Sequence, residues 1–516
     1  MVGIHMPMHS VQQPARSIMT SGSEEDSLAA AASRKGLYPK SHIAVELDNF
    51  YSSKVYTTGS SVSGNVVIIT KRDIRFDNLQ ILLLGNTKTR SDGVNSPQEV
   101  SHTFLKLIMP IPESSYPVPR VLETGREYTI PFHFVIPSYL TVNACNHHMS
   151  HDQLQDQHVL LPPSMGHWEK SDMSPQMAVA EYSIKARVLR DDEVTRKPSR
   201  IFETSRRIHV LPASAEEPPL NVTKRDVLYK MNKSKSVRKN LLSSKLGRIT
   251  ADAIQSSPVY VRPDGRRASG AVAQIDLKFE PASADTQLPK VSSASGKVAA
   301  HTFYSSGTIP NFPNLGDWSL QYMAAKHGEY STSVALAPFE VSKNRWTQHL
   351  APTARRDSGY ASDQDECASE SDSLNSSIRQ SSGSNSNSNN NKTKKLRTRS
   401  GSPIFHTTSL SIPIQLPVDK KTFIPTFHSC IVSRVYVLHL TVVVAVGSAS
   451  TTLNLALPLQ VAVEPASPQA LGLPSFETAI EEAEAAEADE DFLLPRMIAV
   501  PEWRYHETSE LPGYVR

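Results

Sequence analysis

The chain has 516 residues, which allows two to four domains, or two domains together with long unstructured segments. Its 54 Lys and Arg residues nearly balance its 51 Asp and Glu residues, so bulk charge gives no reason to expect nucleic-acid binding. Prolines (36) outnumber glycines (22), which disfavours a long helical bundle. Three cysteines cannot form a disulfide framework, so we expect a reduced chain in the cytoplasm or nucleus.

Nothing in the sequence predicts secretion or a membrane span. The first residues lack the continuous apolar segment of a signal peptide. The most apolar stretch, Val435 to Val446, is about a dozen residues long, whereas a membrane helix needs roughly 20. We therefore expect a buried strand there and only peripheral contact with membranes.

Short strands are predicted from residue 38 to residue 212, after a Ser- and Ala-rich segment, residues 1–37, that is expected to be disordered. Apolar side chains recur at every second position in several runs, which places each run on one face of a strand. Four such runs are Val62 to Ile68, Leu79 to Leu83, Tyr128 to Ile136 and Tyr182 to Val188. Because no helical period separates them, an antiparallel β-sandwich is predicted.

A basic linker is expected over residues 213–256. Between Lys224 and Asp252 the chain has nine Lys or Arg residues and two Asp residues, a local charge of +7. The scattered apolar residues fit either a short basic helix or a solvated linker. Its lysines are also candidates for contact with anionic lipid.

A second β-domain is predicted over residues 257–465. It is interrupted at 352–402 by a low-complexity insertion expected to be disordered. Alternation returns from His406 to Leu416 and again around Tyr436 and Leu453, and Pro458 indicates an edge strand or a bulge. Residues 466–516 form an acidic tail. The predicted fold is all-β, with two tandem sandwiches.

The ordered set of strands in the first domain resembles the arrestin family. Tyr56 to Val66 is similar to the opening Y-x-x-G-x-x-V-x-G-x-V pattern of arrestin-type domains. Leu79 to Gly85, Tyr128 to Pro137 and Val179 to Val188 resemble the strands that follow it, in the family's order. The Leu161-Pro-Pro163 loop and Cys145 look like fungal α-arrestins. This resemblance implies tandem immunoglobulin-like sandwiches of the arrestin type. No polar core like that of receptor-binding visual arrestins can be placed.

The resemblance also implies a role as an adaptor between membrane transporters or receptors and a HECT-type ubiquitin ligase. Such adaptors reach the ligase through Pro- and Tyr-containing motifs that bind WW domains. Leu511, Pro512 and Tyr514 form a variant LPxY motif in the tail and are the expected WW-binding residues. The expected location is the cytoplasm, at the periphery of the plasma membrane and endosomes.

Two kinds of regulatory signal stand in expected loops and in the tail. Ser269 follows two arginines, and Ser358 and Ser362 lie in a D-S-G-x-x-S sequence, so these three serines are candidate phosphorylation sites. In the tail, Asp489, Leu493 and Leu494 resemble an acidic dileucine sorting signal. An acidic segment with two unrelated leucines is the plainer alternative.

A His-rich segment invites a zinc interpretation. Its ligand types suit zinc, but the spacing matches no standard finger, so a polar loop is the preferred interpretation and no metal or other cofactor is assigned. The residues concerned are Cys145, His147, His148, His151, His158 and His167.

No catalytic motif is present, neither G-x-S-x-G nor a Gly-rich phosphate loop nor H-E-x-x-H. We therefore predict a non-enzymatic adaptor with protein partners and no nucleic acid. An arrestin-fold scaffold for endosomal sorting or pH signalling, which recruits no ligase, is the alternative. A metal-dependent enzyme built on the His-rich segment is a third, weaker hypothesis.

Overall fold

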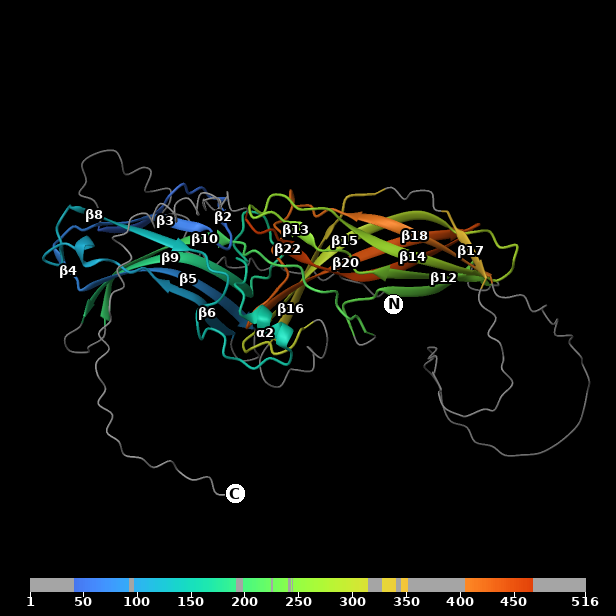
Figure 1. Cartoon of the computed structure of the whole chain (residues 1–516), viewed down its shortest axis with the longest axis horizontal. Helices are drawn as coiled ribbons and strands as arrows, with labels where there is room; N and C mark the ends of the chain where they lie inside the picture. Colours follow the sequence, from blue (N-terminus) through green and yellow to red (C-terminus); the bar gives the residue numbers. More distant parts are fainter. Residues whose placement is uncertain are drawn as a thin grey trace, which may run out of the picture.

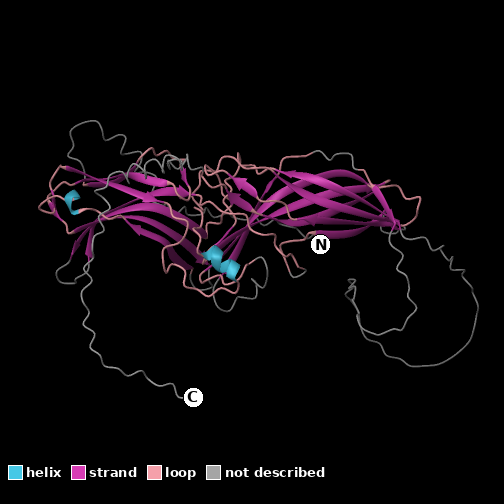
Figure 2. Ribbon diagram, in the orientation of Figure 1, coloured by secondary structure: helices cyan, strands magenta, loops and turns pink. Residues whose placement is uncertain are grey.

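The computed structural model describes residues 41–91, 97–191, 198–223, 226–239, 243, 245–313, 327–339, 345–350 and 404–466. These residues form two elongated β-sheet lobes joined end to end (Figure 1). Strands dominate both lobes, and one short α-helix lies near the place where they meet (Figure 2). The predicted all-β sandwich class is confirmed.

The first lobe is built from two facing sheets. The three-stranded sheet has the order β1 (His42–Leu47), β3 (Ser61–Ile69), β8 (Glu127–Val135). The five-stranded sheet has the order β2 (Val55–Tyr56), β10 (Pro198–Val210), β9 (Ala178–Asp191), β5 (Asn78–Ser91), β6 (Gln98–Ile108). Smaller elements are β4 (Ile74–Arg75), β7 (Val121–Leu122), the 3-10 turn η1 (Glu113–Ser115) and the helix α2 (Asp152–His158).

The predicted alternation explains the packing of this lobe. Along β3 and β8 the side chains at every second position are buried, including Val62, Val66, Ile130 and Phe132. They meet the inward side chains of β5 and β9 in one apolar core. The four sequence runs are therefore strands, as predicted, and each contributes its apolar face to this core.

The second lobe is also a pair of sheets. One has the order β11 (Asn232–Arg238), β12 (Lys245–Ile254), β14 (Ala271–Pro281), β18 (Ile404–Ile414), β17 (Thr347–Leu350). The other has the order β16 (His327–Ala335), β15 (Lys290–Ser305), β20 (Val432–Val446), β19 (Phe427–His428), and β21 (Ala449–Leu459) also pairs with β20. The short strands β13 (Val259–Val261) and β22 (Val461–Val463) pair in parallel.

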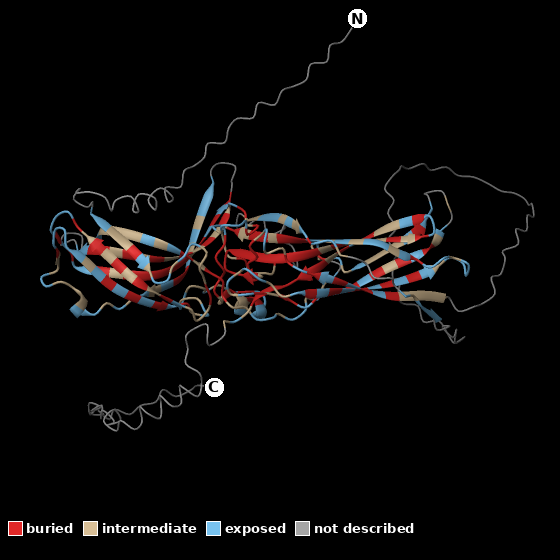
Figure 3. Ribbon diagram, turned by 90° about the horizontal axis from the view of Figure 1, so that it is seen from above, coloured by how far each residue is buried: buried red, intermediate tan, exposed pale blue. Residues whose placement is uncertain are grey.

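The apolar stretch Val435 to Val446 is a buried strand, as predicted, because it lies within β20. Buried residues run along the interior of both lobes and across their junction (Figure 3). Strand β21 pairs with β20 and makes one further isolated bridge, Ala456 with Lys230. Pro458 thus lies in a strand whose second side is almost unpaired. This agrees with the expected edge strand, since proline has no N–H to donate to a neighbouring strand.

The expectation for residues 213–256 is corrected by the structure. Part of this range forms strands β11 and β12 and is therefore neither a helix nor a free linker. Strand β11 pairs with β12, and β12 pairs with β14. Residues before them are also packed, since Tyr229 is buried against Ala299 and Val437. Lysines did not prevent a strand because β11 is an edge strand, where Lys233 and Lys235 stay partly exposed and Arg238 is exposed.

Several expectations lie outside the described residues. These are the disordered segment 1–37, the insertion 352–402 and nearly all of the acidic tail 466–516. The other domain boundaries given by the sequence stay predictions.

Candidate functional sites at the lobe junction and the sheet edges

A buried arginine joins the two lobes. Arg434, in β20, is fully buried, and its Nε donates to Thr302 Oγ1 of β15 at 2.8 Å. The guanidinium also reaches the first-lobe loop before β9, where Nη1 donates to the Asp172 carbonyl (3.0 Å) and Nη2 to Ser174 Oγ (2.8 Å). We call Arg434, Thr302, Asp172 and Ser174 the arginine cluster. A buried charge needs such partners, so this cluster fixes the loop against the second lobe.

The Ser174 hydroxyl lies between the Asp172 carboxylate and the Arg434 guanidinium. Ser174 Oγ donates to Asp172 Oδ2 at 2.9 Å while it accepts from Arg434. The Gly166 N–H donates to the same carboxylate oxygen at 2.8 Å. Between Asp172 and Ser174, Met173 enters the apolar core of the second lobe. A polar core of the visual-arrestin kind could not be placed from the sequence, and the structure shows a buried polar cluster at this junction.

A second cluster at the junction combines thiols and imidazoles. Potential ligand atoms of Cys145, His158 and Cys430 lie within 4.8 Å of one another, and so do those of His102, His147 and Cys430. We call these five residues the thiol–imidazole cluster. Cys430 lies between β19 and β20, whereas the other four belong to the first lobe. The His-rich segment therefore supplies three of the five residues.

The other histidines singled out from the sequence do not join this cluster. His148 is exposed, and His167 Nε2 lies 2.9 Å from Glu181 Oε1. His151 stacks on Phe312, with ring centroids 6.3 Å apart. Sequence reasoning missed His102 and Cys430, because β6 and the turn before β20 are far from the His-rich segment in the chain. Only the tertiary fold brings them together.

Burial sets the protonation of the junction histidines. Desolvation, helped by the nearby His147 and His102, lowers the pKa of His158 to about 4. Desolvation lowers the pKa of His428 to about 3, with a smaller contribution from His158. Burial raises the pKa of the Cys430 thiol to about 12, and the neighbouring Cys145 thiol adds to this effect. Without a bound cation, these groups are neutral near pH 7.

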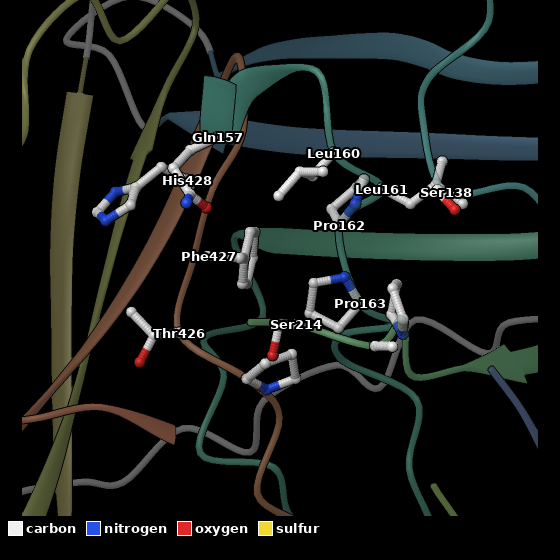
Figure 4. Close-up of a pocket in the computed structure, with 13 residues that line it drawn as sticks. Ser138, Gln157, Leu160, Leu161, Pro162, Pro163, Ser214, Thr426, Phe427 and His428 are labelled. Atoms are coloured by element: carbon white, nitrogen blue, oxygen red, sulfur yellow. The ribbon is translucent and has the colours of Figure 1, made fainter. Parts of the chain in front are cut away.

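A small cavity also lies at the junction, and Figure 4 shows the residues that line it. They come from the Leu160 to Pro163 loop, from residues 212–214 and from the segment Pro425 to His428, together with Ser138 and Gln157. The cavity measures about 30 Å³. That volume is close to the space of one water molecule, far below the ~300 Å³ or more of a typical small-molecule site. This cavity is thus too small for an organic substrate.

A basic edge strand borders the second lobe. Strand β11 carries Lys233, Lys235 and Arg238, and the exposed Lys230 precedes it. The ammonium groups are crowded. The charge of Lys230 is the main cause that lowers the pKa of Lys233, and partial burial and the charge of Lys235 add to it. Arg248 of β12 lies beside this strand and donates from Nε to Ser234 Oγ at 2.6 Å. In the strand register Lys233 and Lys235 lie opposite Ala251 and Ile249, whereas Arg248 lies opposite Ser236 on the other face. The lipid-binding hypothesis for this segment therefore concerns a sheet edge.

Other sheet edges offer backbone groups to partners. Within the described residues, β16 pairs with β15 alone, and β17 pairs with β18 alone. Edge strand β6 is partly covered, since the Thr141 N–H donates to the Phe104 carbonyl at 3.1 Å. Strands β16 and β17 are the more open candidates for an added strand.

Of the predicted site residues, only Ser269 lies in the described chain. It is half-buried, and its Oγ accepts a hydrogen bond from the Tyr260 N–H at 2.9 Å. Its own N–H donates to the Tyr260 carbonyl at 2.7 Å. These two contacts hold Ser269 in a hairpin beside Tyr260. Its modification stays a prediction.

The remaining predicted site residues lie outside the described residues. They are Ser358, Ser362, Asp489, Leu493, Leu494, Leu511, Pro512 and Tyr514. In the described part of the chain, each helix is too short or too polar to span a bilayer.

Comparison with known proteins gives one family match. Residues 342–463 match the model of the Bul1 C terminus, and Bul1 is an arrestin-related trafficking adaptor of yeast. The match covers about a quarter of the chain, and its described part contains strands β17 to β22. It supports an arrestin-like family of fungal adaptors for this chain. No curated protein matches the chain.

Proposed function

We propose that this chain, an arrestin-like protein of the fungal adaptor type, links membrane transporters or receptors to a HECT-type ubiquitin ligase that carries WW domains. Ubiquitin transferred to the bound cargo then promotes its endocytosis. The adaptor works in the cytoplasm, at the periphery of the plasma membrane and endosomes, without catalytic activity of its own.

The match to the Bul1 C terminus over residues 342–463 is the observation that carries this proposal. The architecture agrees with it in physical terms. Two long sandwiches present large faces and several sheet edges, while the junction cavity of about 30 Å³ is too small for an organic substrate. These features favour binding between proteins over chemistry in a pocket.

Ligase recruitment is assigned to Leu511, Pro512 and Tyr514. Proline pre-orders a polyproline II segment, and a WW domain binds the proline and the tyrosine in an aromatic groove. Leu511 stands where a typical motif has its first proline, so we expect a weaker ligand than a PPxY peptide. These residues lie outside the described part of the chain.

Cargo binding is assigned to an edge of the second lobe. Strand β16 has nine residues, and most of its side chains are exposed or half-buried. An extended cytosolic segment of a transporter could pair with its outer side, since backbone hydrogen bonds give affinity and alternate side chains give selectivity.

Recruitment is tested by a pull-down of the full-length chain with purified WW domains of a HECT ligase. We expect Tyr514→Ala to weaken binding at least tenfold, because the tyrosine fills the aromatic groove. Tyr505→Ala, in the same tail, is the matched control and should bind like the wild type. Equal binding by Tyr514→Ala and wild type would remove LPxY recruitment from the proposal.

The alternative is an endosomal sorting or pH-signalling scaffold that acts without the ligase. The dileucine-like residues Asp489, Leu493 and Leu494 favour it. Cells that lack the protein distinguish the two functions. Loss of cargo ubiquitination supports the ligase adaptor, whereas cargo that is missorted yet normally ubiquitinated supports the scaffold.

A further inference from the structure

Metal-binding side chains from both lobes converge in the thiol–imidazole cluster. Cys145 and His147 come from the loop before α2, His158 from the last turn of α2, and His102 from β6. Cys430 comes from the second lobe, where its carbonyl oxygen accepts a hydrogen bond of 2.8 Å from the Ile309 N–H. Cys430 belongs to both groups of three whose potential ligand atoms lie within 4.8 Å of one another. The other four donors therefore lie close to its sulfur.

His158 has unsatisfied polar atoms that point to a missing partner. Its side chain is fully buried, and neither Nδ1 nor Nε2 has a hydrogen-bond partner. An unsatisfied buried polar group costs about 1 to 3 kcal/mol, so folded proteins seldom retain one without a reason. A metal bond to one ring nitrogen would satisfy it.

His102 is oriented as metal-binding histidines commonly are. Its Nε2 lies 2.8 Å from the carbonyl oxygen of Ala144 and can donate to it. A backbone carbonyl that accepts from one ring nitrogen fixes the ring and leaves the other nitrogen free to bind a metal. Ala144 directly precedes Cys145 in the chain. The same short piece of loop therefore supplies the Cys145 thiol and holds the His102 ring.

We propose that the thiol–imidazole cluster is a structural zinc site that ties the two lobes together. Cys145, His158 and Cys430 are three of the ligands, and a histidine of the pair His102 and His147 is the fourth. Two sulfur and two nitrogen donors without an open position are typical of structural zinc.

The geometry requires only small adjustments. Zinc bonds of about 2.0 to 2.3 Å place the ligand atoms of a tetrahedral site roughly 3.3 to 3.8 Å apart. Within each group of three the ligand atoms lie within 4.8 Å of one another, so shifts of about 1 Å bring Cys145, His158 and Cys430 to these spacings. The fourth ligand, His102 or His147, belongs to the other group around Cys430 and must turn toward them. Rotation about the side-chain bonds of cysteine and histidine supplies such shifts.

The site would add a metal bond to the contacts of the arginine cluster. Cys430 and Arg434 lie four residues apart on the same side of the junction, and both reach the first lobe. Zinc bound here would couple the orientation of the lobes to metal occupancy. This role needs no reaction and does not depend on the ligase proposal.

The test measures metal in the full-length chain, expressed in zinc-supplied cells and purified in reductant without chelator. We expect about one zinc per chain by mass spectrometry. Cys145→Ser and Cys430→Ser should each lower it at least tenfold, and His148→Asn, an exposed neighbour of the site, should retain it. His102→Asn and His147→Asn identify the fourth ligand by which of them weakens zinc binding at least tenfold.

A second measurement uses the wild type alone, so the proposal can be tested even if the variants fail to fold. Wild-type protein stripped of metal is titrated with Co²⁺, which should give the visible bands of tetrahedral cobalt and a thiolate-to-cobalt absorption. Absence of both zinc and cobalt signals from folded wild type would overturn the proposal. Equal zinc in Cys430→Ser, no loss in either histidine variant, or a Cys145–Cys430 disulfide in the reduced preparation would also overturn it.

Discussion

Arg434 and Ser174 lie in different lobes, and the guanidinium of the first donates a hydrogen bond of 2.8 Å to the hydroxyl of the second. The same hydroxyl donates to Asp172, so it stands between a buried cation and a carboxylate.

We expect Ser174→Ala to lower the free energy of unfolding by about 1 to 3 kcal/mol, because a buried charged donor loses its partner. Urea unfolding measures this change. Ser236→Ala, on the exposed edge strand β11, should change stability by less than about 0.5 kcal/mol. Equal losses in the two variants would contradict a specific role of the arginine cluster.

Gly64 is the glycine at which β3 passes closest to β1. A Cβ on this residue would lie 2.0 Å from the carbonyl oxygen of Glu46, so the two strands would have to separate. We expect Gly64→Ala to destabilise the protein by about 1 to 3 kcal/mol or more. Gly270→Ala is the matched control, since a Cβ on Gly270 would lie 4.0 Å from the Ile414 carbonyl oxygen, an ordinary van der Waals distance. Thermal unfolding of the two variants compares them, and a similar melting temperature for both would refute the close approach.

The Glu181 carboxylate makes stability depend on acid. A hydrogen bond from His167 above all, together with the charges of Lys88 and Arg207, lowers the pKa of Glu181 to about 2 against the opposing effect of burial. A carboxylate with a lowered pKa stabilises the fold above pH 4.5, and this contribution is lost as the pH falls from 4.5 toward 2. We expect a loss of about 1 to 2 kcal/mol over this window.

Unfolding of wild type and two variants from pH 6 to pH 2 checks this prediction. Glu181→Gln should show a flatter decline. His167→Gln should lose stability at higher pH than wild type, because the carboxylate has lost its main donor. An unchanged pH profile in Glu181→Gln would exclude this carboxylate as the cause.

The basic strand β11 should bind anionic membranes. Reversing Lys233 and Lys235 to Glu should weaken binding to vesicles with phosphatidylserine about ten- to thirtyfold, since each basic residue contributes about 1 kcal/mol near such a surface. The control reverses Lys106 and Lys290, which are exposed on other sheets and carry the same charge change. Co-sedimentation at low and high salt measures binding. If both double variants bind equally weakly, total charge rather than β11 explains the attraction.

The first lobe could be predicted from the sequence because its inward positions hold large apolar residues. Val62, Val66 and Ile68 mark the buried face of β3 clearly, and Gly64 between them is explained by the contact with Glu46. The family pattern of the opening strands therefore has a physical basis. The strand period can be recognised without coordinates, whereas the close approach to Glu46 is seen only in the fold.

The basic segment was mistaken for a linker because its buried positions carry small or polar residues. In β11 only Val237 is a buried apolar residue, and in β12 the inward positions hold one large apolar residue, Ile249, beside Gly247, Ala251 and Ala253. Such residues give no apolar alternation, so the strands are recognisable only from their pairing with β14. For the junction clusters the difficulty is distance in the sequence. Nothing near Cys145 in the chain indicates that Cys430 lies beside it.

The pairing of Leu350 with Ile404 has a practical consequence for protein engineering. The chain leaves the sheet and returns to it at neighbouring positions of two hydrogen-bonded strands, so a two- to five-residue turn is long enough to join them. A shortened protein in which such a turn replaces residues 351–403 should keep both sandwiches. Its comparison with the full-length chain in cells would separate what the sheets bind from what the intervening sequence regulates.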